Sequence, residues 1–316
     1  MTGLTITTTD LGLGYGSTSV LEGVHLDLDA NRIHGLLGRN GTGKTTLLSA
    51  IASLRGPNRG TLRVDGEDPF ENERLMERIC LIRESGDVLA DEKISSTLEL
   101  WQLARPSFDR AWADHLLQEF GLSPTAKPSA LSRGQQSAFG VVLGLASRAP
   151  VTMFDEVHLG MDAPARQLFY DTLLADFAER PRTVILSSHL ISEIEHLLET
   201  VTILHGGSLL LSEDVDDLRT AGATVTGPTS AVAAFCADQQ VLATRELGPT
   251  RQVTLFGDLD QHALDRAGQE GLDVGPVPLQ DLFIHLTGTP ASGAQAGPAS
   301  RHTASRTTSQ TTQETS

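Results

Sequence analysis

The pattern of apolar and polar residues along the chain divides it into strand-like and helix-like stretches. Residues 24–29 read VHLDLD, and this alternation is typical of a half-buried strand. The stretch VTILHGGSLLLS at 201–212 predicts a hairpin that turns at Gly206 and Gly207. Short apolar runs predict further strands at 4–8, 33–38, 60–66, 79–82, 151–156 and 182–189.

Helical periodicity occupies much of the chain between these strands. Leu47, Leu48, Ile51 and Leu54 fall on one side of a helix that follows the glycine-rich stretch at 38–45. Residues from about 94 to 149 have a helical pattern without a clear strand. Strand–helix units around an inserted helical block predict an α/β fold with a largely parallel sheet, preceded by a small antiparallel β part.

The pattern of expected elements changes near residue 222, and the composition changes near residue 289. We expect one domain over 1–222, in which about 90–150 form the helical block. Residues 223–288 alternate short strands with helices, including a helix over SAVAAFCADQQ at 230–240, and predict a small C-terminal α+β appendage. Residues 289–316 carry no large apolar side chain, so nothing offsets the entropy of ordering them and we expect a disordered tail.

Composition and charge narrow the class of protein. The 316 residues carry a formal net charge of −16 and a hydrophobic share of 39%. An acidic balance argues against broad binding of nucleic acid or of an anionic membrane, so no nucleic-acid partner is expected. We find no secretory signal at the N-terminus and no apolar run near the roughly 18 residues that span a bilayer. Cys80 and Cys236 lie far apart and indicate ordinary core thiols.

The stretch GRNGTGKT at 38–45, here called the phosphate loop, fits a nucleotide-binding pattern. Its glycines let consecutive N–H groups point into one hollow, and the helix that follows adds its positive end. Lys44 supplies a charge for the β and γ phosphates, and the Thr45 hydroxyl can ligate Mg²⁺. The residues expected to hold the nucleotide here are Gly38, Arg39, Asn40, Gly41, Thr42, Gly43, Lys44, Thr45 and Thr46.

Phosphoryl transfer needs charge neutralisation and a positioned water, so acidic groups should stand near the phosphate loop. The apolar strand VTMFDE at 151–156 ends in a suitable pair. Asp155 would hold Mg²⁺ through water, and Glu156 would orient and polarise the attacking water. The two motifs together predict a nucleotide-binding protein that uses Mg²⁺ and transfers a phosphoryl group to water.

With these motifs the chain resembles the nucleotide-binding subunit of ABC transporters over about residues 5–220. GLLGRNGTGKTTLL, LSRGQ, VTMFDE and SSH occur in that family's order and at its spacing. LSRGQ at 131–135, here called the signature loop, best distinguishes this family from other phosphate-loop ATPases, because many of those lack it. The resemblance implies two subunits paired head to tail around two ATP, with Ser132, Gly134 and Gln135 of one facing the ATP of the other.

The resemblance also assigns roles to three isolated residues. His189, in SSH, matches the switch histidine that contacts the γ-phosphate. Tyr15, in GYG, matches the aromatic residue that stacks on adenine, and Asp162 matches the loop aspartate that communicates across the dimer. Residues without a motif, expected to be structural or solvated, are His158, His196 and His205.

Three positions depart from the family pattern. Val157 and Arg39 stand where proline is frequent, and neither change removes a group that the reaction needs. Glu84 occupies the place of the glutamine that touches Mg²⁺ and the attacking water. A carboxylate can still ligate Mg²⁺, but it adds negative charge near the phosphates, so turnover or the Mg²⁺ dependence is expected to differ.

The resemblance implies an ATPase that pairs with a second ATPase subunit and drives a separate transmembrane permease at the cytoplasmic face of the membrane. The stretches PLQDLFIHLTG at 278–288 and FDEVHLGMD at 154–162 favour export of a drug, antibiotic, lipid or peptide. The alternative is a soluble ABC-type ATPase of translation or DNA maintenance, which usually has two such domains or long heptad helices. A non-enzymatic binding module would be expected to lack Lys44 or Glu156.

Overall fold

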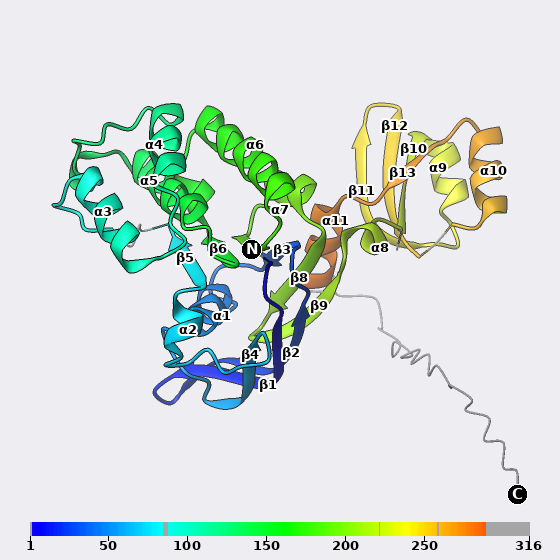
Figure 1. Ribbon diagram of the computed structural model, residues 1–316. Helices are drawn as coiled ribbons and strands as arrows, with labels where there is room; N and C mark the ends of the chain where they lie inside the picture. Colours follow the sequence, from blue (N-terminus) through cyan, green and yellow to red (C-terminus); the bar gives the residue numbers. More distant parts are fainter. Residues whose placement is uncertain (1, 85–87, 221, 258, 289–316) are drawn as a thin grey trace, which may run out of the picture.

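The computed structural model describes residues 2–84, 88–220, 222–257 and 259–288. The tail expected at 289–316 lies outside these residues. Figure 1 shows three regions: a strand-rich region at the N-terminus, a helix-rich region around α3 to α6, and a separate sheet formed by the last third of the chain. No helix among the described residues is long and apolar enough to cross a membrane.

The main sheet has six strands in the order β5-β6-β7-β3-β8-β9. Every neighbouring pair is parallel except the β8–β9 hairpin, which turns at the predicted glycines. β3, β6 and β7 are buried along their whole length, which explains their unbroken apolar sequences. The bounds are β3 (Ile33–Leu37), β5 (Ile79–Arg83), β6 (Val151–Asp155), β7 (Thr183–Ser188), β8 (Thr200–His205) and β9 (Ser208–Asp214).

A second, three-stranded antiparallel sheet lies at the N-terminal end of the chain, in the order β2-β1-β4. The helix α1 (Lys44–Ile51) packs between this sheet and the main one, and Leu48 and Ile51 are fully buried there. The two sheets with their helices confirm the predicted α/β class with an antiparallel N-terminal part. The strand bounds are β1 (Ile6–Tyr15), β2 (Thr18–Leu28) and β4 (Arg59–Val64).

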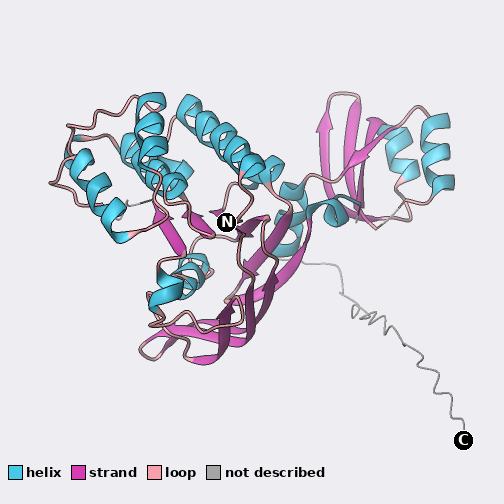
Figure 2. Cartoon of the chain, viewed as in Figure 1, coloured by secondary structure: helices cyan, strands magenta, loops and turns pink. Residues whose placement is uncertain are grey.

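The helical block is inserted between β5 and β6, and α5 attaches it to the main sheet. Ten of the fourteen residues of α5 are buried, and α5 contacts both β5 and β6. Figure 2 shows this block as the part of the main body that is made of helices alone. The helices of the block are α3 (Ile94–Ala104), α4 (Arg110–Glu119) and α5 (Arg133–Ala146). Outside the block, α2 (Glu73–Met76) precedes β5, α6 (Ala163–Glu179) follows β6 and α7 (Ile191–Ile194) follows β7.

A buried ionic network ties the helical block to the main sheet. The Asp176 side chain, on α6, is only 3% exposed and accepts a hydrogen bond from Arg148. Its other oxygen lies 2.7 Å from Nη2 of Arg182, which precedes β7. Arg148 also lies 3.1 Å from Asp109, the residue that caps α4. The network therefore joins α4, α6 and β7. Burial raises the pKa of Asp109, but hydrogen bonds from the Trp112 N–H and from the Arg148 and Arg180 guanidinium groups together hold it below its usual value.

The last third of the chain forms a four-stranded antiparallel sheet, the accessory sheet, in the order β11-β12-β10-β13. The helix expected over 230–240 ends at Phe235, and Gln240 already begins a strand, so that prediction was wrong in its second half. The elements are α8 (Val215–Thr220), β10 (Gly222–Pro228), α9 (Thr229–Phe235), β11 (Gln240–Leu247), β12 (Thr250–Phe256), α10 (Gln261–Gln269), β13 (Asp273–Pro276) and α11 (Leu279–Thr287).

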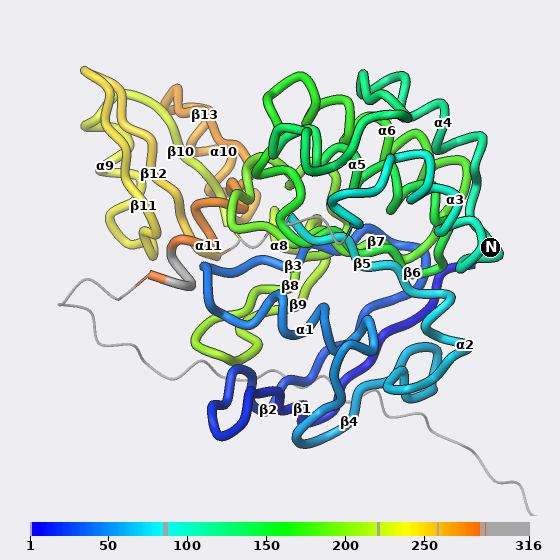
Figure 3. The backbone as a smooth tube through the Cα atoms, turned by 90° about the vertical axis from the view of Figure 1, so that its left-hand side faces the viewer, coloured from blue at the N-terminus to red at the C-terminus, as the bar shows by residue number. Residues whose placement is uncertain are grey.

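The accessory sheet has its own small core, but its last helix belongs to the main one. Leu279, Leu282 and Phe283 of α11 are buried in the same apolar cluster as the main sheet, and α11 contacts α7. Figure 3 shows α11 between the accessory sheet and the main body. On its other side, Asp281 accepts hydrogen bonds from Arg245 of β11, at 2.5 Å, and from Thr254 of β12, at 3.3 Å. Helix α11 thus links the two regions.

Candidate active site

The phosphate loop connects the end of β3 to the start of α1. Gly41 and Gly43 have φ angles of 81° and 105°, a left-handed region in which a side chain would be strained. Gly43 is also the cap of α1, so the first N–H groups of that helix are exposed to the loop's hollow. The loop therefore has the geometry that binds an anion at a helix N-terminus.

Lys44 is buried, and its ammonium group contacts both the phosphate loop and the acidic end of β6. Its Nζ donates a hydrogen bond to the Gly38 carbonyl at 2.7 Å and lies 3.1 Å from Oε1 of Glu156. Lys44 is only 5% exposed, and burying an ammonium group is costly unless it is paired and hydrogen-bonded in this way. The ammonium group is thus fixed between the loop that would hold phosphates and the carboxylate that would activate water.

A pocket of about 500 Å³ opens over the loop. Eight of the residues that the sequence singled out line it, together with Val20 and Leu159: Asn40, Gly41, Gly43, Lys44, Thr45, Thr46, Glu84 and Glu156. Gly38, Arg39, Thr42 and Asp155 do not line the pocket, although all are loop or strand neighbours of residues that do. The structure thus brings the phosphate loop and the acidic pair together.

Asp155 is the last residue of β6 and contacts the phosphate loop side through Thr45. Its Oδ2 accepts a hydrogen bond of 2.6 Å from the Thr45 hydroxyl, whereas its Oδ1 is buried with no hydrogen-bond partner. A buried carboxylate oxygen without a partner is costly, and it suits a hard cation that also takes a hydroxyl and phosphate oxygens as ligands. These residues therefore fit Mg²⁺, which typically binds one or two carboxylates besides the nucleotide.

Glu156 has a strained backbone and a side chain that is held from two sides. Its φ angle is 56°, in the left-handed region, and its N–H donates to the Ser187 carbonyl at 3.2 Å. One carboxylate oxygen faces Lys44 and the other lies 3.0 Å from Nδ1 of His189. The strain and the two contacts place the carboxylate over the pocket in one orientation.

His158 is a buried histidine next to this group. Its Nε2 lies 3.0 Å from the Ser188 hydroxyl, and the side chain is 3% exposed. Burial, with smaller contributions from Arg166 and His189, lowers its pKa to about 4. His158 is therefore neutral at pH 7 and supports the end of β7 from which His189 extends, a contact that the sequence alone did not indicate.

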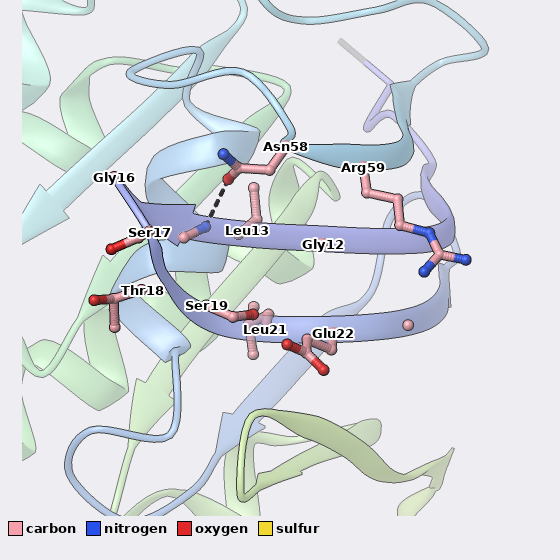
Figure 4. A pocket seen from close by; sticks show the side chains of 12 residues that line it. Gly12, Leu13, Gly16, Ser17, Thr18, Ser19, Leu21, Glu22, Asn58 and Arg59 are labelled. Carbon is pink, nitrogen blue, oxygen red and sulfur yellow. Dashed lines mark hydrogen bonds between the residues drawn. The ribbon is translucent and has the colours of Figure 1, made fainter.

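Tyr15 lies near the tip of the β1–β2 hairpin, outside the phosphate pocket. The side chain is 60% exposed, and the Arg55 guanidinium lies 4.2 Å from its ring centre. A hollow of about 340 Å³ runs along this hairpin, and Figure 4 shows Asn58 among the residues that line it. The Asn58 side-chain oxygen accepts a hydrogen bond of 2.7 Å from the N–H of Gly14, the residue before Tyr15. Arg55 and Asn58 thus fix the hairpin that carries Tyr15.

The signature loop is at the start of α5, away from the pocket lining. Ser132 and Gln135 form a reciprocal capping box: the Ser132 hydroxyl accepts from the Gln135 N–H at 3.3 Å, and the Gln135 amide oxygen accepts from the Ser132 N–H at 3.0 Å. A Cβ at Gly134 would lie 2.7 Å from the Gly160 carbonyl, so only glycine fits there. Asp162 caps α6 through a 2.9 Å bond from the Ala165 N–H.

Glu84 follows β5 and contacts both the acidic strand and the signature loop. Its N–H donates to the Asp155 carbonyl at 3.0 Å. Its carboxylate accepts a 2.7 Å hydrogen bond from Nη2 of Arg133, the third residue of the signature loop. This ion pair joins residues 49 positions apart, and no local pattern in the sequence could have indicated it.

Comparison with known proteins agrees with this geometry. The family model described as "ABC transporter" matches residues 21–158. The bacitracin transport ATP-binding protein BcrA of Bacillus licheniformis is 30% identical over 217 residues, which cover 68% of this chain and 71% of that protein. A solved ATP-binding subunit of an ABC transporter superposes with a TM-score of 0.62 at 26% identity, over 68% of this chain and 91% of that one.

Two further relatives differ in how far the match extends. The daunorubicin/doxorubicin resistance ATP-binding protein DrrA of Streptomyces peucetius is 26% identical over 314 residues, which cover 90% of this chain and 93% of that protein. The methionine import ATP-binding protein MetN 2 of Pseudomonas aeruginosa is 28% identical and covers 63% of this chain. A match over 90% of the chain must include part of the accessory sheet region.

Proposed function

The chain belongs to the ABC transporter family of ATP-binding subunits, which hydrolyse ATP, and from that premise we propose that it powers the export of a drug- or antibiotic-like molecule through a separate permease. The observation that supports export rather than import is the length of the match to the drug-resistance relative. That match reaches into the accessory sheet region, whereas the match to the methionine importer covers less than two thirds of the chain.

In this proposal the phosphate loop holds the triphosphate of ATP. Backbone N–H groups at Gly41 and Gly43 and the start of α1 face the phosphate oxygens, and Lys44 turns from Glu156 towards the β and γ phosphates. Thr46 and the other loop residues complete the cradle. Tyr15 stacks on the adenine, with the Arg55 guanidinium against its ring.

Thr45 and Asp155 hold Mg²⁺ between the loop and the acidic strand. The 2.6 Å contact between them and the unpartnered Oδ1 of Asp155 support this assignment. Mg²⁺ supplies charge neutralisation for the β and γ phosphates and orients them for in-line attack. Glu84 lines the same pocket, with its carboxylate bonded to Arg133.

Glu156 orients and polarises the attacking water, and His189 holds its carboxylate. Both contacts of Glu156 support this role, because Lys44 and His189 approach opposite oxygens and leave the carboxylate fixed at the pocket wall. When Lys44 binds the phosphates in place of Glu156, one oxygen of the Glu156 carboxylate becomes free to accept a proton from water. His189 then also lies within reach of the γ-phosphate.

The signature loop completes the site of a second ATPase subunit. Ser132, Gly134 and Gln135 lie outside their own chain's pocket, at the N-terminus of a fourteen-residue helix that can bind an anion. ABC cassettes work in pairs with transmembrane components, and one solved relative is described as a dimeric bacterial ABC transporter cassette. We place this chain in such a pair, with Asp162 near the partner, at the cytoplasmic face of the membrane.

The test is transport in inside-out membrane vesicles that contain the chain and its permease. ATP should drive accumulation of fluorescent daunorubicin or of labelled bacitracin, and Lys44→Ala should abolish both accumulation and ATP hydrolysis. Vesicles that hydrolyse ATP but accumulate neither probe would contradict this substrate class. ATP-driven movement of the probes in the opposite direction would contradict export.

A further inference from the structure

The ion pair between Glu84 and Arg133 connects the rim of the nucleotide pocket to the signature loop of the same chain. Glu84 lines the pocket with Lys44, Thr45 and Glu156, and its backbone is bonded to Asp155. Arg133 reaches it from the first residue of α5, with 2.7 Å between Nη2 and Oε1. The Arg133 side chain is 83% exposed, so it adds little packing to the fold.

The ion pair changes the net charge around the nucleotide pocket. Lys44 contributes one positive charge, whereas Glu84, Asp155 and Glu156 contribute three negative charges around the place of the triphosphate. With a neutral side chain at position 84, the pocket would carry two negative charges instead of three. The positive charge of Arg133, paired with Glu84, offsets the third one and gives the same net charge. Arg133 does not itself line the pocket, so its charge acts on the triphosphate through the Glu84 carboxylate that it pairs with.

An exposed ion pair of this kind contributes little to fold stability, because water and salt screen it. Its effect on a nearby polyanion is different, since an unpaired carboxylate repels a triphosphate directly. A charge-assisted hydrogen bond also fixes the direction of the carboxylate. The consequence of the pair should therefore appear in nucleotide binding rather than in the melting temperature.

Building on the proposed function, we propose that Arg133 is a positioning residue for Glu84. It holds the Glu84 carboxylate at the rim of its own chain's pocket and neutralises it, so that ATP binds beside a glutamate as it would beside an uncharged residue. The basic residue of the signature loop thus serves its own chain's ATP site, in addition to any contact of the loop with a partner.

A double-mutant cycle tests this with equilibrium binding. Calorimetry would measure the affinity for ATP in EDTA, where hydrolysis is absent, and for a non-hydrolysable ATP analogue with Mg²⁺. In the parent chain, Arg133→Gln should weaken binding of metal-free ATP about three- to tenfold. It should weaken binding with Mg²⁺ less, because the cation offsets the released carboxylate. In a Glu84→Gln background, Arg133→Gln should change neither affinity.

Each other result identifies what failed. Equal weakening in both backgrounds would mean that Arg133 contacts ATP itself, and no weakening in either would mean that the pair is only a surface contact; both results overturn the inference. Arg110→Gln, which breaks an ion pair with Asp114 on α4, is the matched control and should leave both affinities unchanged. A parent chain that binds no ATP would instead overturn the proposed function.

Discussion

At the scale of single residues, buried polar groups hold the site in place before any ligand binds. Glu156 has a strained backbone, and the ammonium group of the buried Lys44 contacts the Gly38 and Arg39 carbonyls and Glu156. His158 supports the neighbouring strand end as a neutral ring. These groups cost stability unless every contact forms, so the site is where the fold should respond most to pH and to substitution.

The first prediction concerns His158 and acid. Its pKa is lowered to about 4 in the folded chain, below the value of about 6.5 in an unfolded chain. The unfolded state therefore binds the proton first, and stability that is present above pH 6.5 is lost as the pH falls towards 4. We expect this residue to contribute a loss of about 2–3 kcal/mol over that range.

Denaturant unfolding of the parent and of His158→Gln at pH 7.5 and pH 5 measures this loss of stability. Glutamine can still bond the Ser188 hydroxyl but does not titrate, so the variant should lose less stability on acidification than the parent. Because other acid-sensitive groups, such as the buried His34, are present in both proteins, the difference between the two isolates His158. Identical losses in the two proteins would refute the assignment.

At the scale of elements, the ends of helices supply most of the predicted functional positions. Ser132 and Gln135 cap α5, Asp162 caps α6, and the phosphate loop precedes α1. Each of these residues satisfies a backbone group of its own helix besides the role that we propose for it. Substitutions at these positions therefore have two effects, which can be separated by the choice of side chain.

The second prediction separates the two effects at Ser132. Ser132→Ala removes the cap of α5 and should cost about 1 kcal/mol, or roughly 2–4 °C in melting temperature. Ser132→Asp keeps an oxygen that can cap the helix but places a carboxylate where a partner's γ-phosphate would dock. It should melt near the parent and bind ATP normally as an isolated subunit, while ATP turnover collapses. Parent-like turnover by a stable Ser132→Asp protein would argue against the partner contact.

The third prediction concerns the network that joins α4, α6 and β7. Asp176→Asn leaves Arg148 and Arg182 without their shared carboxylate and should reduce the free energy of unfolding by about 3–5 kcal/mol. Asp114→Asn removes a carboxylate from an exposed ion pair on α4 and should cost less than about 1 kcal/mol. Denaturant unfolding of both variants at pH 7.5 provides the comparison. Similar losses would show that the network adds nothing beyond a surface pair.

The elements that the sequence predicted are those with a strong apolar pattern of their own. β3, β6 and β7 are buried on both faces, and their composition alone marks them. β11 was missed because it is an edge strand with mostly exposed residues, and its pairing with β12 rather than its own pattern makes it a strand. The Glu84–Arg133 and His158–Ser188 contacts were missed because tertiary folding alone brings those residues together.

At the scale of the whole molecule, helix α11 joins the main body to the accessory sheet, which also has an apolar cluster of its own. Leu279, Leu282 and Phe283 of α11 contribute to the core of the main sheet, and Asp281 on the same helix is bonded to β11 and β12. Helix α11 also contacts α7, which begins two residues after His189. The accessory region should therefore unfold together with the main body.

The fourth prediction tests this with the two tryptophans of the chain, Trp101 and Trp112, which both lie in the helical block. Leu282→Ala should reduce the stability reported by their fluorescence by about 2–5 kcal/mol, although the substitution is in the last helix. Ile284→Ala, at a half-exposed position of the same helix, should cost less than about 1 kcal/mol. An unchanged tryptophan transition in Leu282→Ala would mean that the two regions unfold separately.

The capping box at the start of α5 has a kinetic consequence for assembly. Because the Ser132 and Gln135 side chains already bond each other's backbone N–H groups, this helix end is ordered during folding and not during docking. A surface that is rigid in advance loses little conformational entropy when a second subunit approaches, so encounters need not wait for a loop to fold. In the pair that we propose, variants of the interface should therefore differ mainly in the lifetime of the pair rather than in the rate at which it forms.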